Sequence, residues 1–391
     1  MGFYLQDPGA SDTTYLIEIL VEKCQGATGG GASFAWATSR GVNLLLENEH
    51  FVDFLRQRNF DLVVGVDAVT DEKALASLVR LQAELTKFSV SVFLNTYKGP
   101  LFHPKVCWFR RGATGTLVTG SGNLTEGGLS RNWEAFTVTN LDKNDLDKLE
   151  RQWKAWKSAY ADDLLAPSDH AVIERAKKNA ATKAYSKGTL GVGSAKKALG
   201  KKLPGNPPVA VAPPAATAQP RKATAAKASA VVSSGADVLV AEIPKASNRW
   251  NQANFDQGNY ENYFGAKVGA QRFMFFRHVK TDGTIGDTET RPSVAVKSSN
   301  YRFELHAASG LSYPRAGRPI AIFLKQAARN FLYQLLMPGD AGHMEMDQLL
   351  SSHWIGPSGR VRRMRFDRSI VYTKWPSSPI WAVADAEPEE I

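Results

Sequence analysis

A long stretch without hydrophobic periodicity divides this chain. From Arg175 to Ala236 the sequence is rich in Ala, Lys, Pro and Gly, and it holds twelve Lys or Arg residues and no Asp or Glu. Such a composition buries too little apolar surface to offset the entropy lost on ordering, so we predict a disordered, semi-extended linker. The chain then folds as two units, with expected bounds of 1–168 for the first, 169–245 for the linker and 246–391 for the second.

The linker also accounts for the basic character of the chain. The whole sequence has a net charge of +10. The segment from Arg175 to Ala236 alone contributes +12, so the rest of the chain has a net charge of 10 − 12 = −2. A basic linker can hold nucleic-acid phosphates or can serve as a soluble spacer, and the sequence favours neither interpretation over the other.

Composition excludes several other classes of protein. No apolar run reaches the roughly 18 to 20 residues of a membrane span. The first residues lack the basic region and apolar stretch of a secretory signal. The two cysteines, Cys24 and Cys107, are too few for a disulfide framework or a structural zinc site. We therefore expect a cytoplasmic protein.

The first unit alternates between strand and helix patterns. Strands are expected at 32–39, 60–66 and 88–95, helices at 41–58, 71–85 and 142–165, and three β-rich pieces between 103 and 140. This order predicts an α/β domain with a mixed sheet. The glycine-rich segment 26–33 lacks the Lys of a phosphate-binding loop, and we expect a flexible loop there.

The second unit is mostly β by its pattern. Aromatic and β-branched segments alternate with Gly, Pro and Asp turn signals from about residue 246 onward. One of the expected strands covers 369–375, and the segment 344–354 is expected to be a short helix.

The chemistry concentrates between residues 103 and 134. His103 and Lys105 are two residues apart, so in a strand they share one face together with Cys107. The next β-rich piece ends in Gly-Ser-Gly-Asn, where Ser121 and Asn123 can donate hydrogen bonds to phosphate oxygens. Glu134 then opens another strand and could accept a hydrogen bond from His103, which would fix the orientation of the imidazole.

These residues resemble the signature of the phospholipase D superfamily, in which His-x-Lys is followed by Gly-Ser-x-Asn. The match is most similar to the metal-independent restriction endonuclease branch, which has one motif per chain and a Glu after the Asn. The resemblance implies that His103 is catalytic, that Lys105, Ser121 and Asn123 bind phosphate, and that Glu134 orients His103. The chain departs from the superfamily pattern at Arg110, where an Asp is usual.

The resemblance also implies a mechanism and a partner. One histidine attacks phosphorus to give a phosphohistidine, and a second protonates the leaving oxygen and then activates water, without a metal or other cofactor. One motif supplies one histidine, so a homodimer with the two motifs facing each other is expected. The implied fold is a phospholipase D-like mixed sheet with flanking helices, followed by a β domain resembling a DNA-binding pseudobarrel.

A second His-x-Lys, formed by His278 and Lys280, could provide an internal second motif. A turn signal follows it directly and no Gly-Ser precedes Asn300, so a surface or DNA-contacting role for His278 is favoured. Clustered arginines of the second unit are candidates for DNA contacts, with a solvated basic face as the alternative. These arginines are Arg315, Arg318, Arg360, Arg362, Arg363 and Arg365.

The sequence thus predicts an endonuclease that cleaves DNA, with a restriction-like or phage-defence role. Three alternatives stay open. The first is a phospholipase D-type phosphodiesterase or transferase acting on lipid, the second is a non-specific nuclease effector gated by a partner, and the third is a binding protein with a decayed site. Intact His103, Lys105, Asn123 and Glu134 argue against decay.

Overall fold

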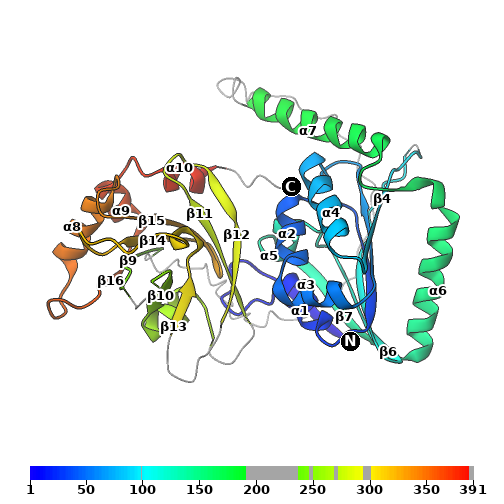
Figure 1. Cartoon of the computed structure of the whole chain (residues 1–391), viewed down its shortest axis with the longest axis horizontal. Helices are drawn as coiled ribbons and strands as arrows, with labels where there is room; N and C mark the ends of the chain where they lie inside the picture. Colours follow the sequence, from blue (N-terminus) through cyan, green and yellow to red (C-terminus); the bar gives the residue numbers. More distant parts are fainter. Residues whose placement is uncertain (98, 191–236, 246–249, 268–271, 294–300, 387–391) are drawn as a thin grey trace, which may run out of the picture.

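The computed structural model describes residues 1–97, 99–190, 237–245, 250–267, 272–293 and 301–386. It contains an α/β domain followed by a mostly β domain, as the sequence predicts (Figure 1). The first domain is built on one eight-stranded sheet, in which β2 pairs in parallel with β3, and β3 with β4, while the remaining pairs are antiparallel. In spatial order its strands are β1 (Gly2–Gln6), β7 (Glu134–Leu141), β6 (Thr114–Gly120), β5 (Lys105–Arg111), β2 (Gly29–Phe34), β3 (Phe60–Gly65), β4 (Phe88–Phe93) and β8 (Leu164–Leu165).

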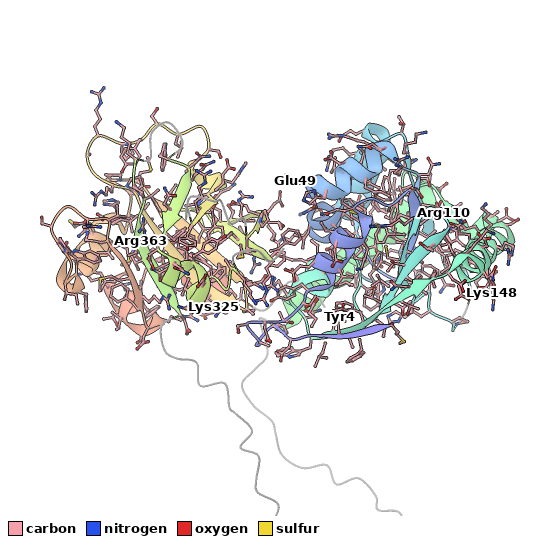
Figure 2. All side chains as sticks on the ribbon, turned by 90° about the horizontal axis from the view of Figure 1, so that it is seen from below. Tyr4, Glu49, Arg110, Lys148, Lys325 and Arg363 are labelled. Atoms are coloured by element: carbon pink, nitrogen blue, oxygen red, sulfur yellow. The ribbon has the colours of Figure 1, made fainter. Side chains whose placement is uncertain are left out.

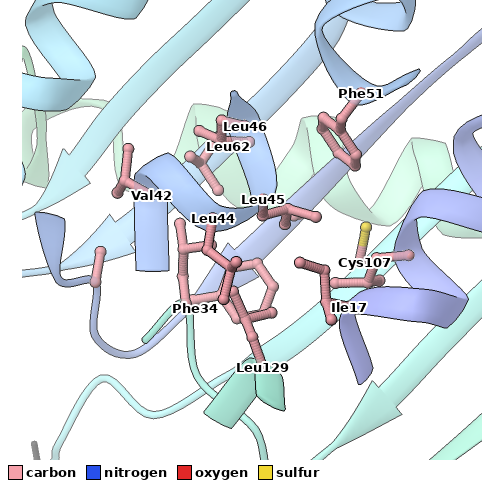
Figure 3. Packing of buried hydrophobic residues seen from close by; sticks show 14 of the residues in the cluster. Ile17, Phe34, Val42, Leu44, Leu45, Leu46, Phe51, Leu62, Cys107 and Leu129 are labelled. Carbon is pink, nitrogen blue, oxygen red and sulfur yellow. The ribbon is translucent and has the colours of Figure 1, made fainter. Parts of the chain in front are cut away.

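Helices cover both faces of this sheet (Figure 1). One face carries α1 (Leu16–Cys24), α2 (Ser39–Leu46), α3 (Glu49–Gln57), α4 (Glu72–Glu84) and the short α5 (Glu126–Ser130); the other carries α6 (Lys143–Ala159), and α7 (His170–Leu190) follows. Buried side chains such as Ile17, Phe34 and Leu45 fill the space between the sheet and the first group of helices (Figure 3). Cys107 lies in the same core, where its thiol packs as a small buried side chain.

Local signals explain where the helices begin. Asp71 accepts a hydrogen bond from the backbone N–H of Ala74 at 3.1 Å and so caps α4 at the predicted position. The expected single helix over 41–58 is wrong, because the chain forms α2 and α3 instead. Asn48 lies between them with an extended backbone and accepts a hydrogen bond from the N–H of His50 at 3.2 Å, which starts a new helix.

The glycine-rich segment 26–33 is not a flexible loop. Most of it belongs to β2, which lies near the middle of the sheet between β5 and β3. A Cβ atom on Gly31 would lie 2.4 Å from the ring of Trp108. The glycines therefore let a neighbouring strand and its tryptophan approach closely, which is a packing requirement that the sequence pattern alone does not show.

The linker prediction is wrong at both ends. Residues 170–190 form α7, in which Val172 and Ala176 are buried against the first domain, and Ala and Lys are good helix formers. The strand β9 (Val238–Glu242) lies inside the sheet of the second domain. Residues 191–236, on which the prediction of disorder also falls, lie outside the described residues.

The second domain has a six-stranded sheet with a two-stranded sheet beside it. The larger sheet has the order β12 (Ile285–Pro292), β11 (Phe273–Val279), β15 (Asn330–Leu336), β14 (Ile320–Ala327), β9 and β16 (Arg363–Phe366), and the smaller pairs β10 (Gln252–Phe255) with β13 (Tyr301–Glu304). Helix α8 (His343–His353) lies between β15 and β16 in the chain and confirms the helix expected at 344–354, and α9 (Arg368–Lys374) and α10 (Pro379–Asp385) follow β16. The strand expected at 369–375 is wrong, because Val371 and Trp375 are both buried at the i, i+4 spacing of a helix.

The two domains share a buried interface. Arg329, between β14 and β15, is 1% exposed and forms an ion pair with Glu18 of α1. Its guanidinium also donates to the carbonyl oxygens of Phe273 at 2.9 Å and Thr13 at 2.6 Å. Phe273 and Phe275 pack into the core of the first domain. The second domain is therefore seated on the face that carries α1 and α5.

Candidate active site

Strand ends bring the predicted motif together. β5 begins at Lys105, its neighbour β6 ends at Gly120, and β7 begins at Glu134, all at the same end of the sheet. His103 precedes β5 and does not lie in it, so the predicted strand alternation of His103 with Lys105 is wrong. Lys105 and Cys107 do share a face of β5.

His103 and Lys105 nevertheless contact each other through their side chains. Lys105 Nζ lies 2.8 Å from Nδ1 and 2.9 Å from Nε2 of His103. An ammonium group has only protons to donate, so it pairs with a lone pair of a neutral imidazole. Partial burial and the positive charge of Lys105 both lower the pKa of His103. A lower pKa favours the neutral form of the imidazole, and only the neutral form can act as a nucleophile.

Trp36, just after β2, connects this pair to Asn123. Its ring meets the His103 ring edge-on, with 5.2 Å between centroids, and Lys105 Nζ lies 5.7 Å from its centroid. Its backbone N–H donates to Oδ1 of Asn123 at 3.3 Å. With Oδ1 engaged in this way, the Nδ2 hydrogens of Asn123 are the donors left for an anionic oxygen. Sequence reasoning placed Trp36 in a strand and gave it no role.

Ser121 and Glu134 complete the group. The Ser121 hydroxyl donates to the Glu134 carboxylate and accepts from the backbone N–H of Ala135 at 3.1 Å. Burial lowers the pKa of Lys105, and the negative charge of Glu134 opposes that shift. Within the described part of the chain, no hydrogen bond joins Glu134 to His103. The contact predicted to orient the imidazole is thus replaced by contacts to Lys105 and Trp36.

Arg110 has a structural role at the position where the superfamily usually has Asp. Its guanidinium donates to both carboxylate oxygens of Glu150 on α6, at 2.9 and 2.8 Å. It lies on the first domain beside α6, as Figure 2 shows, at the far end of β5 from Lys105. The departure from the superfamily pattern therefore does not affect the residues that surround His103.

The second His-x-Lys is in a different environment. His278 lies inside β11 and packs on Tyr333 with 5.1 Å between ring centroids. Burial, followed by the charges of Lys280 and His306, lowers its pKa. Asn300 lies outside the described residues. His278 thus lies in the other domain, and among the described residues no hydrogen bond or ring contact joins it to His103, Lys105 or Asn123.

Several of the arginines predicted to contact DNA are bound within the protein. Arg318 and Arg362 form ion pairs with Glu242 at 2.9 and 2.6 Å, and Arg365 donates to Oδ1 of Asn259 at 2.7 Å. Arg363, labelled in Figure 2, is half-buried and lies 6.0 Å from the ring of Phe255. Arg315 and Arg360 are exposed. These two remain the best placed for a phosphate.

The described residues contain no cluster of three or more His, Cys, Asp or Glu side chains that could hold a metal ion. Cys24 and Cys107 are buried free thiols. None of the described helices has the length and hydropathy needed to cross a bilayer.

No protein-family model and no curated protein sequence matches this chain. It is similar to solved structures, among them NucT from Helicobacter pylori, with 11% identity and a TM-score of 0.31 over 42% of this chain and 97% of NucT. Nuc from Salmonella typhimurium, a phospholipase D family member, shows 15% identity and a TM-score of 0.30 over 42% of this chain and 94% of Nuc. Phosphatidylserine synthase from Haemophilus influenzae shows 14% identity and a TM-score of 0.32 over 48% of this chain and 46% of the synthase.

The second of these structures is named as a member of the superfamily that the His-x-Lys and Gly-Ser-x-Asn motifs resemble. Each of the three similarities involves less than half of this chain. We therefore derive the function from the residues of the site.

Proposed function

We propose that this chain is a metal-independent endonuclease that cleaves DNA phosphodiester bonds through a phosphohistidine intermediate. The observation that carries the proposal is the contact between His103 and Lys105, with Asn123 held beside them through Trp36. A nucleophilic nitrogen, a fixed cation and an amide donor are the groups that attack on a phosphodiester requires.

The reaction runs in two displacements. A ring nitrogen of His103 forms a bond to phosphorus, and the bond from phosphorus to the leaving oxygen breaks while a protonated second histidine gives that oxygen its proton. The second histidine, now neutral, removes a proton from water, and the hydroxide displaces His103 from phosphorus. Lys105, Ser121 and Asn123 stabilise the negative charge on the other phosphate oxygens. His and Lys supply the nucleophile and the charge, so the proposal requires no metal.

The second histidine comes from a second copy of the chain in this proposal. His278 lies in the other domain with its ring packed against Tyr333, and we do not assign it to the site of its own chain. A two-fold axis would bring two His103 side chains to one phosphate. One of them then attacks phosphorus, and the other protonates the leaving oxygen. The functional unit is then a homodimer with one composite site.

DNA is favoured as substrate by the distribution of charge. The net charge of the segment from Arg175 to Ala236 is +12, and exposed Arg315 and Arg360 lie on the second domain. Basic groups of this segment, together with those on the second domain, would hold a polyanion that extends well beyond one phosphate. Cleavage at sites read by the second domain would give the protein a restriction-like role in phage defence.

The test is cleavage of plasmid and phage DNA in excess EDTA by the wild-type chain and by His103→Ala. The proposal expects discrete fragments from the wild type alone. A smear would retain the chemistry and remove sequence recognition. Release of headgroup from phospholipid vesicles, with intact DNA, would move the substrate to the lipid alternative. Equal DNA cleavage by both proteins would overturn the assignment of His103.

A further inference from the structure

The helix α5 follows directly after the loop that carries Ser121 and Asn123. The second domain contacts the first residue of this helix. Glu126, which begins α5, is 1% exposed. Its carboxylate accepts a hydrogen bond from the hydroxyl of Thr288 on β12 and lies 3.8 Å from Nε of Arg277 on β11. Arg131 and Arg40 of its own domain lie 3.5 and 4.0 Å away. The charge of one buried carboxylate is thus compensated from both domains.

The second domain also holds the last residue of α5. Asn330, at the start of β15, donates from Nδ2 to the carbonyl oxygen of Ser130 at 3.1 Å. The same amide group lies 3.1 Å from the hydroxyl of Tyr15, just before α1. Three strands of the second domain, β11, β12 and β15, therefore contact a helix of only five residues at both of its ends.

The backbone of α5 rests on the loop that carries Asn123. A Cβ atom on Gly128 would lie 2.5 Å from the backbone nitrogen and 2.6 Å from the carbonyl oxygen of Asn123, and one on Gly122 would lie 2.8 Å from the oxygen of Gly128. No side chain fits between these two pieces of backbone. A shift of α5 is consequently passed to Asn123 directly, because there is no flexible group between them to absorb it.

We propose that Glu126 is a positioning residue through which the second domain places Asn123 for catalysis. The domain that recognises DNA would then also support the phosphate site, whatever sequence it has bound. This inference rests on the proposed function, and it adds a coupling between the domains that DNA recognition alone does not require.

The physical reason lies in the burial of the Glu126 charge. Burial raises the pKa of Glu126, but the charges of Arg277 and Arg131 and the hydrogen bond from Thr288 outweigh it, and the net shift is downward. Glu126 is therefore an ionised carboxylate inside the interface. A buried carboxylate that loses a partner must shift toward its remaining partners or toward water. Here such a shift moves α5.

The test compares Thr288→Val with Thr284→Val in the full-length chain. Both threonines belong to the β11–β12 hairpin, but Thr284 is exposed, and among the described residues its hydroxyl bonds only to Asp282. The rate is measured in single turnovers with saturating enzyme, which separates chemistry from binding. We expect Thr288→Val to slow cleavage by roughly ten- to hundred-fold, as for other small misplacements of catalytic groups. The DNA dissociation constant should stay within twofold of the wild-type value, and Thr288→Ser should restore the rate.

Amide hydrogen exchange over residues 121–129 supplies a readout that needs no activity. In this segment, the amides of Thr288→Val should exchange faster than those of the wild type and of Thr284→Val. Exchange in the remaining core peptides should be the same in all three proteins. Unchanged exchange in this segment, or an unchanged single-turnover rate, would overturn the inference. A wild type that cleaves no DNA, together with faster exchange in Thr288→Val, would instead overturn the proposed function and leave the contact between the domains established.

Discussion

The chain contains the pattern His-x-Lys twice, once at His103 and once at His278, and the two copies have different neighbours. His103 is exposed, lies just before a strand and contacts Lys105, Trp36 and, through Trp36, Asn123. His278 lies within β11, where its ring is packed against Tyr333. The first copy is surrounded by groups that can bind a phosphate, and the second by groups that stabilise a core.

The difference shows what makes such a pattern reactive. A lowered pKa does not distinguish the two histidines, because partial burial and a neighbouring lysine act on both. What distinguishes them is the meeting of strand ends. Three adjacent strands of the first domain have neighbouring ends: β5 begins two residues after His103, β6 ends just before Ser121 and Asn123, and β7 begins at Glu134.

The largest effect expected is on the reaction itself. Replacing His103 by Ala removes the nucleophile and should lower kcat for DNA cleavage by on the order of 10³-fold or more. His278→Ala should leave kcat within about threefold of wild type, since its role is packing. Rates of plasmid cleavage with matched thermal melts check this. Similar losses for both variants at unchanged Tm would contradict the assignment of one reactive copy.

The two lysines of the His-x-Lys patterns should show the same kind of difference in kcat, but a smaller one. Lys105→Met removes the fixed cation beside the phosphate, and kcat should fall by roughly 10²- to 10³-fold, as when one donor to a developing charge is lost. Lys280→Met is the matched control and should change kcat little. Steady-state kinetics on an oligonucleotide duplex separates the two. A larger effect at Lys280 would move the site to the second domain.

Substitutions of the second-domain arginines should change different properties, depending on whether the arginine is exposed or ion-paired. Arg360→Met removes an exposed charge and should lower the slope of log affinity against log salt by about 1. Arg362→Met removes an ion pair with Glu242 and should instead lower the free energy of unfolding by about 1.5–3 kcal/mol. Fluorescence anisotropy at several salt concentrations and urea denaturation measure the two quantities. This distinction would be wrong if Arg362→Met changed the slope of log affinity against log salt and left the free energy of unfolding unchanged.

The smallest effect expected is on titration. Partial burial and Lys105 lower the pKa of His103, so its ring should titrate below the usual value of ~6.5. His103 is then neutral above that pKa and becomes protonated as the pH falls through it. Lys105→Met should raise the pKa by removing a positive charge. A pH titration of the imidazole signals by NMR checks the direction, and an unchanged His103 pKa in Lys105→Met would contradict the contact.

Much of the first domain and its site could be predicted because the signals are local. Hydrophobic periodicity predicted the α/β order, and the spacing of His103, Lys105, Ser121 and Asn123, with the family resemblance, picked out the candidate site. The order of the strands then brings these residues together. The mostly β character of the second domain was predicted on the same grounds.

What the sequence could not show depends on contacts between distant residues. Trp36 acts through a hydrogen bond to a residue 87 positions away, and Thr288 through one to a residue 162 positions away. The ion pair of Arg329 with Glu18 joins residues 311 positions apart. Composition also misled at α7, because Ala and Lys are as compatible with a packed helix as with a linker. The basic arginine cluster looked like one surface, and only the structure shows which members Glu242 and Asn259 hold.

The most direct test of the central claim is to trap the covalent intermediate. DNA is mixed with the wild-type chain in EDTA, the reaction is quenched within its first turnover at alkaline pH, and peptides are mapped by mass spectrometry. A nucleotide phosphate attached to the peptide that contains His103, and missing in His103→Ala, is the predicted result. DNA cleaved with the adduct on His278, or with no adduct on any histidine, would contradict it.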